Sequence, residues 1–172
     1  MTVLVVRHGL AMARDEFQLD DARPLTLIGI RKMQKNARGL EALVRKPDLL
    51  LSSPLTRARQ TAEILQEAWA GLELSVTELL RPTAKPQPLA TLINSHVATT
   101  NEDPLICLVG HEPHLSQLVT WFLKGSGFGA KQKSLIELKK GGACLLEFPH
   151  DIAKAQALLK WLATPCFLKS IR

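Results

Sequence analysis

Short apolar runs alternate with longer segments of helical periodicity along this chain. Runs of three to five aliphatic residues, each ended by polar, glycine or proline residues, predict short buried strands. Apolar residues that recur at intervals of three and four predict amphipathic helices. The predicted strands are residues 3–6, 48–51, 72–80 and 105–109, and the predicted helices are 26–44, 56–69, a segment that ends near 97, and 113–122.

The C-terminal part adds a hairpin signal and one more helical segment. Residues 134–138 and 143–148 resemble two strands joined by Lys139-Lys140-Gly141-Gly142, which predicts a hairpin. Residues 152–163 have helical spacing, and the tail from Pro165 fits neither class. The alternation of strands and helices predicts a three-layer α/β/α sandwich over residues 1–172, a single domain whose mostly parallel central sheet carries an antiparallel edge hairpin.

Length and composition place the chain among ordinary globular proteins. It has 172 residues, 46% hydrophobic and 22% charged, and no stretch approaches the roughly 18 apolar residues of a membrane span. Residues 2–6 are too short a run for the core of a signal peptide, so we expect a cytoplasmic protein without membrane insertion. Cys107, Cys144 and Cys166 lack the spacing of a metal site and are expected to be buried free thiols, with no cofactor.

The charge balance favours anionic partners in general terms. The net charge is +6, from 22 basic and 16 acidic residues. Tyrosine is absent, and basic and aromatic residues are not interleaved as they are in platforms that bind single-stranded nucleic acid. We therefore expect no nucleic-acid partner.

Arg7-His8-Gly9 directly follows the first predicted strand and is the first sign of chemistry in the chain. Arg57 and His111 follow two later predicted strands, and Arg23 precedes the first helix. If these strands are parallel, their carboxyl ends meet at one edge of the sheet, where open α/β folds bind ligands. Arginine donates two hydrogen bonds to one phosphate, and neutral imidazole is a nucleophile near neutral pH. The pattern indicates a phosphoryl-transfer site.

Five segments that lie in the same order resemble the histidine phosphatase superfamily, and specifically its small SixA-type phosphohistidine phosphatase branch. The resemblance implies a phosphoglycerate mutase-like fold and a hydrolase that uses neither metal nor cofactor. It also implies a bound phosphate ion in the site and a phosphorylated protein or small phosphorylated molecule as substrate. The matching segments are 5–11 (VVRHGLA), 20–29 (DDARPLTLIG), 52–62 (SSPLTRARQTA), 109–115 (VGHEPHL) and 140–143 (KGGA).

The resemblance also implies a role for each site residue. His8 would attack phosphorus and carry a transient phosphoryl group that water removes. Arg7, Arg57 and His111 would bind the phosphoryl oxygens, with His111 protonated or donating a hydrogen bond. Arg23 would lie at the rim and help to hold the substrate phosphate or an acidic neighbour.

One departure from the wider superfamily bears on the substrate. Many larger members carry an acidic proton donor after the third strand, where this chain has Pro82, with Glu78 as the only carboxylate close by. The chain also lacks a long lid insertion, which favours an open groove that admits a protein surface. A phosphorylated imidazole leaves more readily than an alkoxide. We therefore expect a phosphohistidine phosphatase; the alternatives are a small-molecule phosphomonoesterase and a non-catalytic phosphate-binding module.

Several other residues have plain structural interpretations. Arg59 lies four residues before Glu63 and is expected to form a solvated helical ion pair. His114, on the helix after the site, either supports the site or is a structural histidine. The tryptophans lie on apolar helix faces and are expected in the core; they are Trp69, Trp121 and Trp161.

Overall fold

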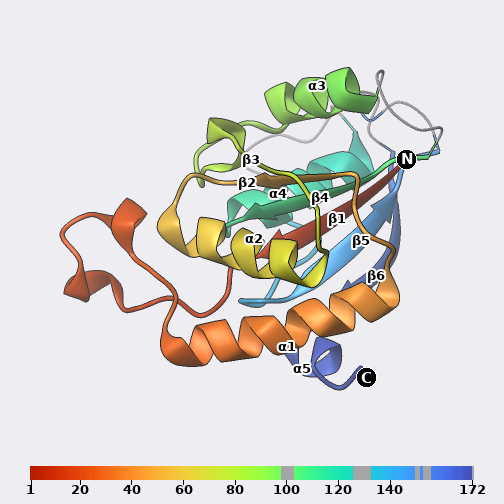
Figure 1. Cartoon of the computed structure of the whole chain (residues 1–172). Helices are drawn as coiled ribbons and strands as arrows, with labels where there is room; N and C mark the ends of the chain where they lie inside the picture. Colours follow the sequence, from red (N-terminus) through yellow and green to blue (C-terminus); the bar gives the residue numbers. More distant parts are fainter. Residues whose placement is uncertain (98–102, 126–132, 150–151, 153–155, 172) are drawn as a thin grey trace.

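One sheet organises the part of the chain that the computed structural model describes, which is residues 1–97, 103–125, 133–149, 152 and 156–171. Its six strands lie in the order β3-β2-β4-β1-β5-β6 (Figure 1). The pairs β1 with β4, β4 with β2, and β2 with β3 are parallel, whereas β5 is antiparallel to both β1 and β6. The strands are β1 (Thr2–Arg7), β2 (Leu49–Ser52), β3 (Leu74–Val76), β4 (Leu105–Gly110), β5 (Ala143–Glu147) and β6 (Leu158–Ala163).

Helices cover both faces of the sheet. Figure 1 shows α1, α2 and α5 on one face and α3 and α4 on the other. Short 3-10 turns lie in the connections that follow β1 and β3. The α-helices are α1 (Leu27–Leu43), α2 (Thr56–Ala68), α3 (Pro86–Val97), α4 (His114–Lys124) and α5 (Pro165–Leu168); the 3-10 turns are η1 (Arg14–Glu16), η2 (Asp20–Ala22) and η3 (Glu78–Leu80).

The alternation of side chains along β1 explains why an apolar cluster lies on each face of the sheet. Val3 and Val5 belong to the apolar cluster under α3 and α4, while Leu4 and Val6 belong to the cluster under α1 and α2. Successive strand side chains point to opposite faces, so a four-residue aliphatic run is stable only where both faces are covered. The expected three-layer α/β/α sandwich with a mostly parallel sheet, the phosphoglycerate mutase-like fold, is confirmed.

The start of α1 is fixed by its cap and by a close backbone approach. Thr26 is the predicted N-cap, and its hydroxyl accepts a hydrogen bond from the Gly29 amide at 2.8 Å. A Cβ at Gly29 would collide with the carbonyl oxygen of Leu10. Glycine therefore takes the place of the acidic residue of a capping box, because the chain leaving the end of β1 passes directly over it.

The predicted hairpin over 134–148 is wrong in its first strand. Residues 133–138 form no strand; the Leu135 and Leu138 amides donate instead to side chains of the 112–120 segment, Thr120 Oγ1 and Glu112 Oε1. These bonds draw 135–138 to α4. The edge hairpin is formed by β5 and β6.

The predicted helix over 152–163 is wrong from Leu158 onward, because β6 occupies Leu158–Ala163 at the edge of the sheet. Residues 153–155 of that prediction lie outside the described residues. The spacing of Leu158, Leu159 and Leu162 imitates a helical stripe, yet these side chains are 57, 40 and 45% exposed. Pairing with β5 outweighs local spacing here. The third predicted strand is shorter than expected, since η3 follows β3 within residues 72–80.

The thiols and tryptophans divide between core and surface. Cys107 and Cys144 are buried free thiols as expected, and burial raises the pKa of both, whereas Cys166 is exposed and corrects the prediction. Trp69 and Trp121 are buried, and Trp161 is partly buried against the core. Within the described ranges, every helix is too short or too polar to cross a bilayer.

Candidate active site

His8 lies directly beyond β1 and is held by the strands and turn around it. Its amide donates to the Gly110 carbonyl at 3.0 Å, and its own carbonyl accepts from the Gly141 amide at 3.0 Å. The side chain is 6% exposed, and Nδ1 lies 2.7 Å from the Gly9 carbonyl oxygen. A carbonyl only accepts, so the imidazole hydrogen is on Nδ1 and the lone pair is on Nε2. The backbone thus fixes the tautomer that a nucleophilic Nε2 requires.

Arg57 lies in the first turn of α2, where a threonine ties it to the loop that carries His8. Thr61 donates its hydroxyl to the Arg57 carbonyl at 2.7 Å and accepts from the Gly9 amide at 3.0 Å. The Arg57 guanidinium is buried and binds one residue twice: Nη1 donates to the Asp20 carbonyl and Nη2 to Asp20 Oδ2, both at 2.8 Å. The predicted convergence of His8 and Arg57 is therefore built through Thr61.

His111 follows β4, next to His8. The two imidazole centroids are 5.0 Å apart with planes inclined by 50°. His111 Nε2 lies 2.8 Å from the hydroxyl oxygen of Ser53, which follows the neighbouring strand β2. When this hydroxyl donates to Nε2, the imidazole hydrogen stays on Nδ1. That tautomer offers one N–H donor to an anion without requiring a charged ring.

Arg7 is the last residue of β1 and is anchored by the 135–138 segment. Its Nη1 donates to the Leu138 carbonyl at 2.6 Å. The Leu138 amide donates in turn to Glu112 Oε1 at 3.2 Å, and the same oxygen accepts the Ser116 hydroxyl at 2.7 Å. Glu112, beside His111 in sequence, therefore holds the backbone that holds Arg7.

Arg23 lies at the edge of this group, just after η2. Its Nη1 donates to the Met12 carbonyl at 3.1 Å, and its Nη2 lies 2.9 Å from Asp20 Oδ1. Arg23 therefore reaches Arg57 through the Asp20 carboxylate that both guanidiniums bind. The rim role expected for Arg23 stays a prediction.

Several buried nitrogens of this group have no hydrogen-bond partner, as is also the case for Trp69, Trp121 and His114. Each of the four side chains predicted to bind phosphoryl oxygens has one buried nitrogen without a hydrogen-bond partner. Unsatisfied buried donors cost free energy, and proteins tolerate them mainly at functional sites or where an ion or water completes them. A tetrahedral oxyanion offers acceptors in several directions at once. The nitrogens are Nε of Arg7, Arg23 and Arg57 and Nδ1 of His111.

Both histidines are neutral before an anion arrives. Burial, together with the charges of Arg57 and Arg7, lowers the pKa of His8 to about 3, despite the opposing hydrogen bond to Gly9. Burial and the neighbouring His8 and Arg57 lower the pKa of His111 to about 2. The nearby Lys140 acts on His8 in the same direction. Of the two states that the resemblance allows for His111, the free protein favours the neutral donor.

Glu78 and Arg59 form surface ion pairs. Glu78, in η3, is paired with Arg81, which also binds Asp21 at 2.7 Å. The Glu78 side chain is 70% exposed, which suits a solvated ion pair. Arg59 pairs with Glu63 at 3.8 Å, as the sequence spacing predicts.

His114 is fully buried, and neither ring nitrogen has a hydrogen-bond partner. Burial lowers its pKa to about 4, so the ring is neutral at the start of α4. A positive charge on His114 would lower the pKa of His111. Both expected roles, structural and supporting, are compatible with this placement.

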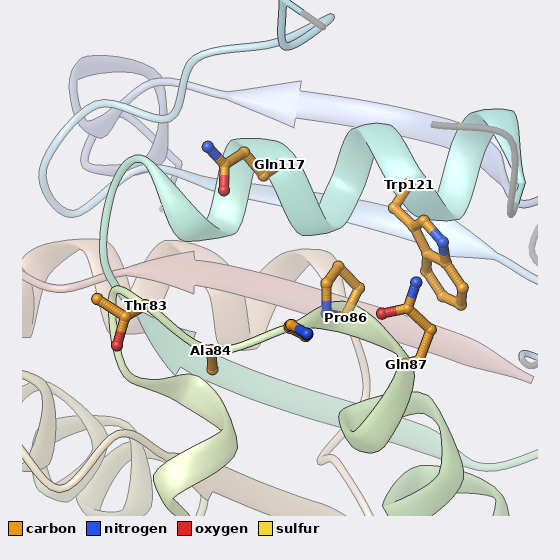
Figure 2. Close-up of a pocket in the computed structure, with 7 residues that line it drawn as sticks. Thr83, Ala84, Pro86, Gln87, Gln117 and Trp121 are labelled. Carbon is orange, nitrogen blue, oxygen red and sulfur yellow. The ribbon is translucent and has the colours of Figure 1, made fainter. Parts of the chain in front are cut away.

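A separate hollow lies between α4 and the segment that leads into α3. Its volume is about 370 Å³, and Figure 2 shows Trp121 reaching from α4 towards Gln87 at the start of α3. Its lining includes Thr83 and Gln117 but none of the predicted site residues. Among the residues described, no group of three His, Cys, Asp or Glu side chains is arranged to hold a metal ion.

The model of the histidine phosphatase superfamily (branch 1) matches residues 3–83. An uncharacterized protein of Picosynechococcus sp. is 32% identical over 165 residues, which cover 94% of this chain and 99% of that protein. The chain belongs to the histidine phosphatase superfamily. Membership supports a phosphatase activity.

Solved structures of other histidine phosphatases share its fold. The protein histidine phosphatase SixA, complexed with tungstate, superposes with a TM-score of 0.80 at 20% identity and covers 96% of this chain and 98% of its own. The mycobacterial glucosyl-3-phosphoglycerate phosphatase in complex with VO3 has a TM-score of 0.70 at 20% identity, covering 95% of this chain and 99% of its own. Both of those proteins were solved with an oxyanion.

Three side chains that contact the predicted site residues could not be singled out from the sequence: Ser53, Asp20 and Thr61. Ser53 and Asp20 lie within segments that carry the family resemblance, but their partners lie 58 and 37 residues away. Glu112 reaches Arg7 only through Leu138, and nothing in the sequence indicates that role. A signal was present for Ser53, since it follows a predicted strand just as His8 and His111 do.

Replacing Ser53 with alanine is expected to lower turnover of a phosphorylated substrate by roughly 10-fold, the equivalent of one hydrogen bond. Without the hydroxyl, His111 is free to carry its hydrogen on Nε2 and to lose its Nδ1 donor. Steady-state kinetics at neutral pH measures the effect. Ser52→Ala is the matched control, because this equally buried serine donates to the Ser53 carbonyl at 3.0 Å rather than to His111. Equal rates for the two variants would contradict the role given to Ser53.

Proposed function

We propose that this histidine phosphatase removes phosphoryl groups from protein phosphohistidine, without a metal, through a covalent intermediate on His8. The observation that carries the proposal is the convergence of Arg57 and His111 on His8, an imidazole whose Nε2 is unprotonated. Thr61 joins Arg57 to the Gly9 amide, and the ring centroids of His8 and His111 are 5.0 Å apart. Cations and donors surround the place where charge develops in phosphoryl transfer, and a nucleophile stands beside them. We further propose that a phosphate ion occupies this place after turnover.

The reaction needs two displacements at phosphorus. The substrate phosphoimidazole reacts with its other ring nitrogen protonated. His8 Nε2 forms a bond to phosphorus as the bond from phosphorus to the substrate nitrogen breaks, and that electron pair stays on the substrate ring, which leaves as neutral imidazole. Nδ1–H keeps its hydrogen bond to the Gly9 carbonyl and stabilises the positive phosphoimidazole ring. Water then attacks phosphorus, the bond to Nε2 breaks, and inorganic phosphate is released. The arginines compensate the phosphoryl charge in both steps.

The leaving group decides between substrates. Transfer from a substrate imidazole to His8 exchanges one phosphorus–nitrogen bond for another. A substrate ring that already carries a proton on its other nitrogen departs as neutral imidazole and needs no proton from the enzyme. An alkoxide needs a general acid, and the nearby carboxylate of Glu78 is held by Arg81 at the surface. This pairing supports phosphohistidine over a phosphate monoester.

The test compares substrates with the same purified protein in the presence of a chelator. We expect phosphate release from a phosphohistidine-carrying protein domain with kcat/KM at least ~100-fold above that for sugar and aryl phosphates, a ratio of the size that one missing general acid produces. A preference for an alkyl monoester would reverse the assignment in favour of a small-molecule phosphomonoesterase. Tight binding of the phosphorylated domain without any phosphate release would indicate a phosphate-binding module instead.

A further inference from the structure

Asp20 is the acceptor that two of the three guanidiniums in the site share. Its Oδ2 and its carbonyl bind Nη2 and Nη1 of Arg57, each at 2.8 Å, and its Oδ1 lies 2.9 Å from Nη2 of Arg23. The three bonds enclose one residue between two cations. Burial acts to raise the pKa of Asp20, but the hydrogen bond from Arg57 and the charges of Arg57 and Arg23 outweigh it and lower the pKa. The residue is a carboxylate at neutral pH.

This arrangement engages the terminal Nη atoms of both arginines, whereas their Nε atoms make no hydrogen bond. Arg57 Nε and Arg23 Nε are buried and have no partner, whereas the Nη atoms named above are bonded to Asp20. Arg7 repeats the pattern, with Nη1 on the Leu138 carbonyl and Nε unpartnered. In all three side chains the chain's own acceptors hold at least one Nη atom of the guanidinium, and Nε is buried.

Electrostatic repulsion explains why a carboxylate is needed between Arg57 and Arg23. Two guanidiniums that converge on one phosphate repel each other, and Arg23 acts on Arg57 as an unfavourable neighbouring charge. A carboxylate between their outer ends offsets that repulsion before substrate binds. It also fixes side chains that otherwise lose several rotatable bonds of freedom when the phosphate binds.

We propose that Asp20 is a positioning residue, which holds Arg57 and Arg23 by their Nη atoms in the places from which these arginines bind the phosphoryl group. The inference rests on the proposed function only in assuming that the site binds an oxyanion. Asp20 itself touches no reacting atom. It acts through the two arginines, and its own position is set by η2, in which the Arg23 amide donates to the Asp20 carbonyl at 3.3 Å.

The neighbouring residue provides a matched control. Asp21 is in the same turn and binds Arg81 at 2.7 Å, but its side chain is 57% exposed and Arg81 is 34% exposed. The Asp20 side chain is 32% exposed and Arg57 is 4% exposed. Asp20→Asn and Asp21→Asn make the same change of charge and size one residue apart, so a general effect of charge or of loop stability acts on both.

Tungstate binding to the purified protein tests the proposal without requiring any substrate. We expect calorimetry at fixed ionic strength to show that Asp20→Asn weakens tungstate binding by ~10-fold or more, because the amide leaves an N–H donor facing a guanidinium. Asp20→Glu restores part of the affinity, and Asp21→Asn stays within ~2-fold of the parent, as is usual for an exposed ion pair. Melting temperatures, measured alongside, separate lost affinity from lost folding.

Two results would overturn the proposal. Unchanged affinity in Asp20→Asn would mean that the arginines hold their places unaided. Tighter binding would mean that the carboxylate competes with the oxyanion for the arginines. If Asp20→Asn melts below the assay temperature, Asp20→Glu decides by the same criteria, with intermediate affinity expected and parental or tighter affinity contradicting. Failure of the parent to hydrolyse phosphohistidine would reject the proposed substrate and leave the tungstate comparison valid.

Discussion

Replacing His8 with asparagine is expected to reduce phosphohistidine hydrolysis by at least ~10⁴-fold, as removal of a nucleophile from a cooperating set does. Asparagine removes the Nε2 lone pair that forms the bond to phosphorus, while Arg7, Arg57 and His111 remain to bind the phosphoryl group. The variant should therefore still bind tungstate. Phosphate release under saturating substrate is the measurement.

A second readout identifies the intermediate in the same experiment. Alkaline quenching of the parent protein during turnover should preserve a phosphoryl group on His8, detectable by mass spectrometry of the peptide, since phosphoimidazoles are labile in acid and stable in base. His96→Asn, at an exposed position on α3, is the control and should retain full activity. Full activity in His8→Asn, or a phosphoryl group found on another residue, would refute the mechanism.

Acid is expected to unfold this protein at unusually mild pH. His8, His111 and His114 have pKa values lowered by burial to about 3, 2 and 4, whereas an unfolded imidazole takes up its proton near pH ~6.5. Below that pH the unfolded chain binds more protons than the folded chain, so stability rises with pH and is lost as pH falls. From about pH 6.5 to about pH 5, each of the three contributes a loss on the order of 1 kcal/mol per pH unit.

Urea denaturation followed by tryptophan fluorescence at a series of pH values measures this slope. His114→Leu is expected to remove about one third of it, since one of three comparable titrations is gone. Stability that stays constant over this range would show that the folded protein accepts these protons.

The strand ends of the site were predictable because local rules decide them. A short aliphatic run that ends at polar residues or glycine is typical of a buried strand. β1 and β4 lie at the runs that predict them, and His8 and His111 directly follow these strands. The contact of His111 with Ser53 was not predictable in the same way. It requires β2 and β4 to be neighbours, and the chain passes through β3 and α3 between them.

The errors lie where tertiary contacts override spacing. The apolar residues of β6 repeat like those of a helix, and only the pairing with β5 makes the segment a strand. Residues 135–138 resemble a strand, but Thr120 and Glu112 bind their amides. No role could be predicted for Asp20. A carboxylate that lies near arginines in the sequence gives no information about which guanidiniums it contacts in the folded protein.

The position of β1 in the sheet makes the end of β1 that carries His8 less tolerant of structural change than the segment between β1 and α1. β1 pairs along its length with β4 on one side and β5 on the other, so His8 cannot shift without disturbing both ladders. The segment between β1 and α1 has no strand of its own beyond a bridge between Ala11 and Leu25, and it carries Asp20 and Arg23. Selection for a new substrate would therefore act first on this segment, and two relatives could differ in what they recognise while sharing one nucleophile and one chemistry.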